Sequence, residues 1–262
     1  SSAMNNKEIR LNQLVNILKE NQKVTVKDLS QLLKVSEMTV RRDLDLLQSN
    51  DIVTRSYGKA TYIANTGHDS NNDNYELNFE QSIMNAEKEI IGKYAASLIE
   101  PGDVLIIDSG STTDKLAQHI PEDSEITVLC YNYNVLSHLI KKDKINLIFG
   151  GGYFHRRAQM FESLQSINLI ENIRATKMFV STSGIHNKLG LTCSQSFEVL
   201  TKRTALQSAQ TKILIADSSK FCKVRTAYFA QLSEIHEIVT DSGISSEWKE
   251  IIESMNIKLH IV

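Results

Sequence analysis

The 262-residue sequence lacks an apolar run of membrane-spanning length, and it carries only three cysteines. Cys130, Cys193 and Cys222 are widely separated and form neither a Cys-x-x-Cys pair nor a Cys/His ligand spacing. This spacing argues against a structural zinc site, and scattered thiols are typical of a reducing compartment. We therefore expect a cytoplasmic protein with no membrane partner, no metal and no cofactor.

The chain also has little net charge, with a formal value of −2, but the charge is unevenly distributed. Up to Ile63 there are 10 Lys and Arg against 7 Asp and Glu, a net +3, whereas the remainder has 19 against 24, a net −5. A positive excess of this size is modest for a nucleic-acid binder. A single copy should therefore bind DNA weakly and in a salt-dependent way.

The length is sufficient for two domains, and composition marks a boundary between them. Residues 64–74 are rich in Asn, Asp, Ser and Gly, and such a segment is too polar to join a core. It is predicted to be a linker between a small domain, residues 4–63, and a larger one, residues 75–262. The sequence contains no internal repeat.

Apolar residues in the small domain recur at helical spacing in three segments. The first two segments are marked by Ile9, Leu14, Val15, Ile17 and Leu18, and by Val26, Leu29, Leu32 and Leu33. The third is marked by Val40, Leu44 and Leu47 and is separated from the second by a very short turn. That arrangement predicts a helix-turn-helix, and apolar segments at 52–54 and 61–63 predict a hairpin wing after it.

The third helix has a clear beginning and a basic outer face. Ser36 is a suitable N-cap, and Glu37 places negative charge near the positive end of the helix dipole. Thr39, Arg41 and Arg42 point away from the apolar stripe. An arginine pair on a helix is often only a solvated surface, but the local charge excess and the wing favour a DNA-recognition helix.

The larger domain alternates short apolar segments with helical patterns. The apolar segments, each typical of a buried parallel strand, are 104–107, 127–129, 145–149, 178–180, 212–216, 238–239 and 258–262. Alternation of this kind predicts a layered α/β domain with a mostly parallel sheet flanked by helices.

Polar loops follow four of these predicted strands, at 108–113, 150–152, 181–184 and 217–220. The first leads into a helix, so its backbone N–H groups, hydroxyls and helix dipole favour an anion such as phosphate. The same residues also fit an ordinary Gly-Ser turn with a helix cap. Open α/β sheets bind ligands at the carboxyl ends of their strands, so we expect the four loops to form one site.

These segments resemble the DeoR-type bacterial transcriptional regulators. The similarity in the small domain lies in 24–33 and in Val35-Ser36 followed by Thr39-Val40-Arg41-Arg42-Asp43-Leu44, and in the larger domain it extends over 87–241. The resemblance implies a winged helix-turn-helix followed by a sensor domain related in fold to ribose-5-phosphate isomerase. It also implies a repressor of carbohydrate genes that binds operator DNA and a phosphorylated sugar or related metabolite. Because a single helix-turn-helix reads few bases, we expect a homo-oligomer, either a dimer or a tetramer.

The resemblance and the local chemistry together assign candidate residues. The DNA-binding candidates are Ser36, Glu37, Met38, Thr39, Arg41, Arg42, Arg55, Tyr57 and Lys59. The effector-binding candidates are Asp108, Ser109, Gly110, Ser111, Thr112, Thr113, Gly151, Gly152, Ser183, Gly184, Asp217 and Lys220. Lys88, Lys202 and Arg203 also occupy basic positions of the family, but we expect them to be solvated surface residues.

The chain departs from the family pattern in two places. In the wing, Tyr57 and Lys59 replace a histidine and a glycine, which predicts stronger phosphate contact but a stiffer turn. In the larger domain, Cys130-Tyr131 stands where many members have Thr-Asn, and Ser163 stands where a glycine is common. These changes predict a reshaped pocket.

Two alternative functions are open. A pure interaction or scaffold module would not use the anion loops, and no small molecule would then stabilise the protein. The other alternative is a sugar-phosphate isomerase joined to a DNA-binding domain. Such an enzyme needs a positioned carboxylate base, and the isomerases carry an acidic run near the position of 181–185. That segment of this chain has no carboxylate. The sequence therefore predicts no catalytic residue and no enzyme activity.

Overall fold

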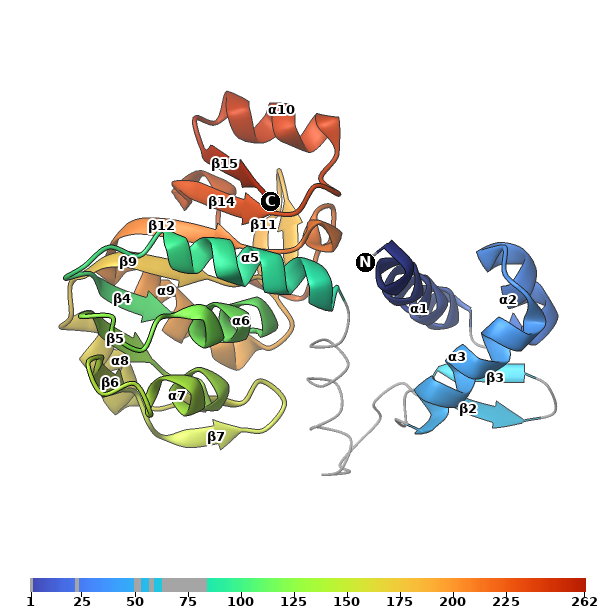
Figure 1. Cartoon of the computed structure of the whole chain (residues 1–262), viewed down its shortest axis with the longest axis horizontal. Helices are drawn as coiled ribbons and strands as arrows, with labels where there is room; N and C mark the ends of the chain where they lie inside the picture. The colour runs from blue at the N-terminus through green and yellow to red at the C-terminus, as the bar shows by residue number, and fades with distance from the viewer. Residues whose placement is uncertain (1, 22–23, 50–52, 57–58, 63–83) are drawn as a thin grey trace. The chain divides into compact units, whose positions relative to one another are not determined.

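The computed structural model describes residues 2–21, 24–49, 53–56, 59–62 and 84–262. The chain divides into two compact units, 1–85 and 86–262 (Figure 1). Tyr57 and the predicted linker 64–74 lie outside the described residues.

The first unit is a winged helix-turn-helix, as predicted. Its elements are α1 (Ser2–Glu20), β1 (Val24–Thr25), α2 (Val26–Leu33), α3 (Glu37–Ser49), β2 (Val53–Ser56) and β3 (Lys59–Tyr62). The strands form an antiparallel sheet in the order β1-β3-β2, in which β2 and β3 are the two strands of the wing.

Side-chain caps define the turn between α2 and α3. The Thr25 hydroxyl accepts a hydrogen bond from the Asp28 backbone N–H and so caps α2. Lys34 ends that helix in the left-handed conformation, with φ 54°. Ser36 then caps α3, as predicted, because its Oγ accepts from the Thr39 N–H at 3.2 Å. These caps set the direction in which α3 leaves the turn.

A compact apolar cluster supports the three helices. Val40 and Leu44 on α3 are fully buried and Leu47 is 1% exposed, which confirms the predicted apolar stripe. Because this stripe faces α1 and α2, the arginines of α3 are directed toward solvent.

The second unit is built on a seven-stranded sheet whose pairings are all parallel. Its strands are β4 (Val104–Ile107), β5 (Thr127–Cys130), β6 (Asn146–Phe149), β9 (Ala175–Val180), β12 (Ala209–Ile215), β14 (Glu237–Thr240) and β15 (Lys258–Ile261). Every predicted strand is present, so the predicted α/β class is confirmed.

Helices cover both faces of this sheet (Figure 1). One face carries α5 (Asn85–Ser97), α6 (Ser111–His119) and α7 (Tyr133–Leu139), and the other carries α8 (Leu164–Glu171), α9 (Val199–Ser208) and α10 (Ser246–Ser254). Alternate strand residues supply the two cores: Leu105 and Ile107 pack on the first face and Ile106 on the second. All three side chains are fully buried, as expected for a sheet between two helical layers.

Two smaller sheets were not predicted from the sequence. One is the hairpin of β7 (Tyr153–His155) and β8 (Met160–Glu162), and the other contains β10 (Gly184–His186), β11 (Gly190–Cys193) and β13 (Ala227–Ala230). Short 3-10 helices lie at Ser196–Glu198, Ser218–Lys220 and Leu232–Glu234. Both small sheets follow strands of the large sheet in sequence, so they add structure close to its carboxyl edge.

The strand order reverses between β4 and β9. From β4 the chain adds β5 and then β6 on one side, after which it returns to place β9, β12, β14 and β15 on the other. The loops after β4 and β9 therefore leave the sheet side by side and run to opposite faces. In open α/β sheets such a reversal is the usual position of a ligand site.

Among the described helices, none is both long and apolar enough to cross a membrane.

Two adjacent glycines after β6 differ in backbone conformation and in the space around them. Gly152 has φ 143°, and a Cβ there would lie 2.2 Å from the Glu162 carbonyl oxygen, whereas a Cβ on Gly151 would meet no atom within 4 Å. We expect Gly152→Ala to lower the free energy of unfolding by about 1–3 kcal/mol. Gly151→Ala, measured beside it by urea unfolding, should change it by less than about 0.5 kcal/mol. Equal losses in the two variants would contradict this geometry.

Candidate functional site

The exposed face of α3 brings together the predicted DNA-binding residues of the first unit. Met38 is 62% exposed, and Arg41 and Arg42 are also exposed. Arg41 lies 3.6 Å from the Glu37 carboxylate one turn earlier, an exposed ion pair that contributes little to stability. Arg41 can therefore exchange Glu37 for a phosphate or a base at small cost.

The predicted wing contacts lie on β2 and β3. Arg55 is paired with Ala60 across the hairpin, and Lys59 with Ser56. The register thus places the two basic residues in adjacent pairs of the hairpin.

A buried polar network occupies the point where the strand order reverses. The Asp108 carboxylate, at the end of β4, forms an ion pair with Lys202 of α9 and accepts a hydrogen bond of 2.6 Å from the Tyr131 hydroxyl. It also accepts the Ser181 backbone N–H at 3.1 Å, at the end of β9. Lys202 donates in addition to the Ser181 carbonyl and lies 4.7 Å from the centre of the Phe229 ring.

The charges in this network are matched to one another. Burial lowers the pKa of Lys202, but the carboxylates of Asp108 and Glu198 outweigh that effect and leave the pKa raised. Burial and the nearby Asp108 carboxylate both raise the pKa of Tyr131. At neutral pH the lysine is therefore charged and the phenol is neutral, so Tyr131 acts as a hydrogen-bond donor.

The expectation that Lys88 and Lys202 are solvated was wrong. Lys88 is 1% exposed and Lys202 is 2% exposed, whereas Arg203 is exposed as expected. Lys202 is buried because Asp108 and Ser181 satisfy its ammonium group. Lys88 lies in the first turn of α5. The last turn of α5 leads by a short loop into the amino end of β4, so the first turn lies near the carboxyl edge of the sheet.

The predicted anion loop runs from Asp108 into the first turn of α6. Gly110 is the N-cap residue of that helix and provides no side-chain cap, and Thr113 donates to its carbonyl at 3.0 Å. A Cβ on Gly110 would lie 2.8 Å from Ser181, so the loops after β4 and β9 are in direct contact. The positive end of the helix dipole is thus directed at this junction.

The turn of the β7–β8 hairpin covers part of the loop. The Ala158 carbonyl accepts from the Ser109 hydroxyl at 3.1 Å and from the Asn132 side-chain amide at 3.0 Å. Asn132 also donates to the Ser109 oxygen at 2.7 Å. Ser109 is consequently 5% exposed and already engaged, whereas Ser111 in the first turn of α6 is more exposed.

Asp217, at the end of β12, is fully buried with an unused acceptor. Its Oδ1 atom accepts from the Ser219 backbone N–H at 3.0 Å, whereas its buried Oδ2 atom has no hydrogen-bond partner among the described residues. Burial acts to raise its pKa, but Lys220, Lys88 and the Ser219 hydrogen bonds outweigh burial and leave the pKa lowered. A buried carboxylate oxygen without a donor is costly, so a ligand donor at this position would be favourable.

Strand spacing sets the width of the candidate site. Asp108, Ser181 and Asp217 follow β4, β9 and β12, which are consecutive in the sheet. Two strand spacings correspond to about 10 Å, within reach of one sugar phosphate. Ser183 follows β9 and Lys220 follows Asp217 on the same stretch of edge, whereas Gly184 is the buried first residue of β10 and lies against the Lys223 backbone.

The turn after β6 lies farther along the edge, two strands beyond β4 on the other side. There Ser163, one of the residues that departs from the family pattern, donates to the Gly151 carbonyl at 2.7 Å. It also accepts from the Ser166 N–H at 3.0 Å and so caps α8. The role of Gly151 and Gly152 toward a ligand stays a prediction.

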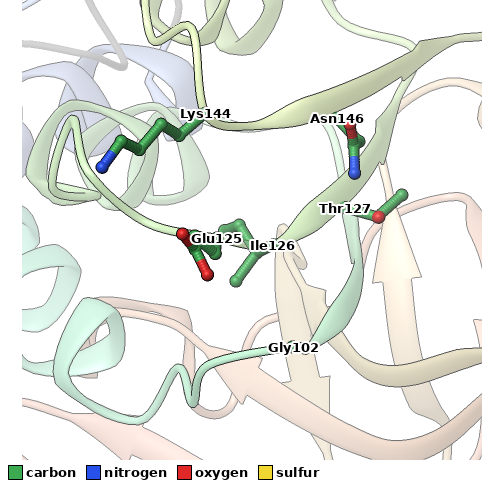
Figure 2. A pocket seen from close by; sticks show the side chains of 6 residues that line it. All are labelled: Gly102, Glu125, Ile126, Thr127, Lys144 and Asn146. Carbon is green, nitrogen blue, oxygen red and sulfur yellow. The ribbon is translucent and has the colours of Figure 1, made fainter.

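A separate pocket of about 430 Å³ lies at the opposite, amino edge of the sheet. Figure 2 shows its lining residues, which precede or begin β4, β5 and β6: Gly102, Glu125, Ile126, Thr127, Lys144 and Asn146. Its two charged residues, Glu125 and Lys144, are exposed and of opposite sign. The pocket has no buried charged group, in contrast to the carboxyl edge.

Across the part of the chain that the structure describes, no three His, Cys, Asp or Glu side chains are grouped to hold a metal ion. Burial raises the pKa of the Cys130 thiol to about 12 and that of Cys193 to about 11. Both thiols are therefore protonated and unreactive at neutral pH.

Both units match models of known families. The model of the DeoR-like helix-turn-helix domain matches residues 10–66. The model of the DeoR C terminal sensor domain matches residues 83–242, more than half of the chain. The two matches together include α3, the wing and the loops after β4, β9 and β12.

Whole-length relatives support the same assignment. The deoxyribose operon repressor of Escherichia coli strain K12 is 31% identical over 253 residues, which cover 97% of this chain and 98% of that protein. The lactose phosphotransferase system repressor of Staphylococcus epidermidis is 32% identical over 251 residues, which cover 95% and 97%. Among solved structures, ribose 5 phosphate isomerase A from Neisseria gonorrhoeae matches 52% of this chain and 53% of its own, with 14% identity and a TM-score of 0.38.

The buried ion pair can be tested by a double-mutant cycle. Lys202→Met leaves the Asp108 carboxylate buried without its cation, so we expect the free energy of unfolding to fall by about 3–5 kcal/mol. The double variant Asp108→Asn, Lys202→Met should lose clearly less than the sum of the single losses. Lys93→Met, at an exposed lysine on α5, is the matched control and should have little effect.

The same cycle has a predicted pH dependence. Because the pKa of Lys202 is raised in the folded chain, its stabilisation is complete below the ordinary lysine pKa of about 10.4 and is lost as pH rises through the folded value. The difference between wild type and Lys202→Met should therefore shrink only in strongly alkaline solution. Additive losses at pH 7 would contradict a coupled pair.

Proposed function

Because the chain belongs to the DeoR family of transcriptional regulators, we propose that it represses genes of carbohydrate metabolism under the control of a phosphorylated sugar. In this proposal, α3 and the wing bind operator DNA, and the carboxyl edge of the large sheet binds the effector. The observation that carries the effector part is the buried Oδ2 atom of Asp217, which has no hydrogen-bond partner among the described residues and lies two strands away from the predicted anion loop at the start of α6.

DNA recognition is supported by the exposed first half of α3. Arg41 and Arg42 supply charge for phosphate contacts, which position a protein on DNA but carry no direct sequence information. Glu37, Met38 and Thr39 occupy the first turn of α3, the part of a recognition helix that usually contacts base edges. We assign operator preference to these three residues and to the wing.

Full occupancy of an operator requires more than one copy of the chain. A single helix-turn-helix reads few bases, and the positive excess of the first domain is small. A dimer or higher oligomer would place recognition helices in successive major grooves, about 34 Å or a multiple of that distance apart. The doubled contact area would then supply operator affinity that one copy lacks.

The effector would bind with its two ends on different loops. Its phosphate would lie at the loop of Ser109 to Thr113 and the first turn of α6, where backbone N–H groups and the helix dipole favour an anion. Its hydroxyl groups would donate to Asp217, whose pKa is lowered and which is therefore an anionic acceptor. A sugar monophosphate has this polarity and fits a width of about 10 Å.

Catalysis of isomerisation is not favoured by the same geometry. Asp108 is occupied by Lys202, Tyr131 and Ser181. The lowered pKa of Asp217 makes it a weak base at neutral pH, whereas efficient general bases have a pKa near the working pH. We propose that the site senses its ligand without converting it.

Two pairs of substitutions should separate the two activities. Arg41→Ala with Arg42→Ala should abolish binding to an operator selected from a random DNA pool, because the phosphate contacts of α3 are lost. The same variant should keep the rise in melting temperature caused by the active member of a sugar-phosphate panel; a ligand at 100 times its Kd stabilises by about 2.7 kcal/mol. Thr112→Val with Lys220→Gln should show the opposite pattern. Unchanged operator binding by the arginine variant, or conversion of the ligand, would refute the proposal.

A substitution at Asp217 should distinguish the two ends of the effector. Asp217→Asn removes a charged acceptor worth roughly 1.5–3 kcal/mol, so affinity for the sugar phosphate should fall about 10-fold or more. Affinity for inorganic phosphate alone, measured by calorimetry, should remain within about 2-fold because that probe does not reach Asp217. Thr112→Val, by comparison, should weaken both ligands. Equal weakening of both ligands by Asp217→Asn would place the phosphate at Asp217 instead.

A further inference from the structure

A groove of about 580 Å³ runs between α1 and α3 in the DNA-binding unit. Its lining residues are Lys7 and Arg10 on α1 and Thr39, Arg42, Asp43, Asp45 and Leu46 on α3. Thr39 and Arg42 also belong to the exposed face of α3 described above. The groove is therefore continuous with the surface to which we assign DNA binding.

One partly buried ion pair, between Arg10 and Asp43, lies in the lining of this groove. The Arg10 guanidinium donates to Asp43 through Nε at 2.6 Å and through Nη2 at 3.1 Å. Asp43 is 3% exposed, and the hydrogen bond to its carboxylate is the main reason that the pKa of Arg10 is raised. This two-point contact spans α1 and α3 and fixes the distance between them.

Because Arg10 and Asp43 carry opposite charges, the pair does not contribute to the net charge of the groove. Arg10 and Asp43 compensate each other, so Lys7 and Arg42 remain as cations against the single carboxylate of Asp45. Lys7 and Arg42 are both exposed, so each can reorient toward a ligand. A groove with net positive charge beside a recognition helix is suited to an anion rather than to an apolar segment.

We propose that this groove binds one backbone phosphate of the operator between Lys7 and Arg42, so that α1 contacts DNA together with α3. The inference rests on the DNA-binding function proposed above and adds a contact from an element outside the helix-turn-helix and the wing. In this arrangement Asp43 does not repel the phosphate, because Arg10 neutralises it. The phosphate contact then fixes how far along the groove of DNA the first turn of α3 is placed.

The salt dependence of binding to a generic 25-base-pair duplex tests this contact without knowledge of the operator. Each phosphate neutralised contributes about 0.9 to the slope of log K against log salt concentration. The double variant Lys7→Gln, Arg42→Gln removes both cations from this phosphate and should reduce the slope by about that amount, so its affinity deficit relative to wild type should be about 3-fold smaller at 200 mM than at 50 mM salt. Lys7→Gln alone leaves Arg42 on the phosphate and should reduce the slope by part of that amount.

Lys19→Gln provides the matched control, because Lys19 lies in the last turn of the same helix and the substitution removes the same charge. Lys7 and Lys19 are about 18 Å apart along the axis of α1, from a rise of about 1.5 Å per residue. The control should keep the wild-type slope. If Lys7→Gln and Lys19→Gln behave identically, a general charge effect explains the result and the groove contact is wrong.

A cycle with Arg42→Gln tests whether the two residues share one phosphate. If they do, the affinity lost by the double variant should be smaller than the product of the two single losses, because the second substitution acts on a contact already weakened. Independent, multiplicative losses would place Lys7 and Arg42 on different phosphates and overturn the shared site. Failure of the wild-type protein to bind the duplex would instead overturn the DNA-binding function itself, and the groove with it.

Discussion

The ion pair between Asp108 and Lys202 is the most deeply buried of the described ion pairs, and it lies where the strand order of the large sheet reverses. Both groups are almost fully removed from water, which is costly unless each charge is compensated and each hydrogen-bonding position is used. Tyr131 and Ser181 complete that requirement around the carboxylate. The pair joins β4, β9 and α9, and so it fixes the relative positions of the loops that leave the sheet at the reversal of strand order.

Most of the framework could be predicted because it depends on local patterns. The seven parallel strands are short continuous apolar segments. The cap of α3 can be predicted from Ser36 and the helical pattern that follows it. The small sheets could not be predicted, because β7, β8 and β10 have only three residues each and none is a continuous apolar segment. Their pairing depends on contacts made after the large sheet has formed.

The buried lysines show a different limit of prediction. Lys202 is 94 residues from Asp108 in the sequence, so the amino-acid pattern around either residue contains no sign of the other. A lysine on a helix is normally solvated, so the sequence alone predicts solvated side chains for Lys88 and Lys202. Two departures from the family pattern have structural explanations that are equally non-local: Tyr131 supports Asp108, and Ser163 caps α8 while holding the Gly151 carbonyl.

The Ser109 hydroxyl has a single proton, and in this structure that proton is directed to the Ala158 carbonyl of the β7–β8 turn. An oxygen of a bound anion that accepts the same proton must compete with Ala158, which would then keep only its bond from Asn132. If the predicted anion takes this proton, its binding and the Ser109–Ala158 hydrogen bond compete at this one atom. Thermodynamic linkage then predicts that a change which weakens the Ala158 hydrogen bond strengthens anion binding at Ser109, even if it touches no part of the ligand.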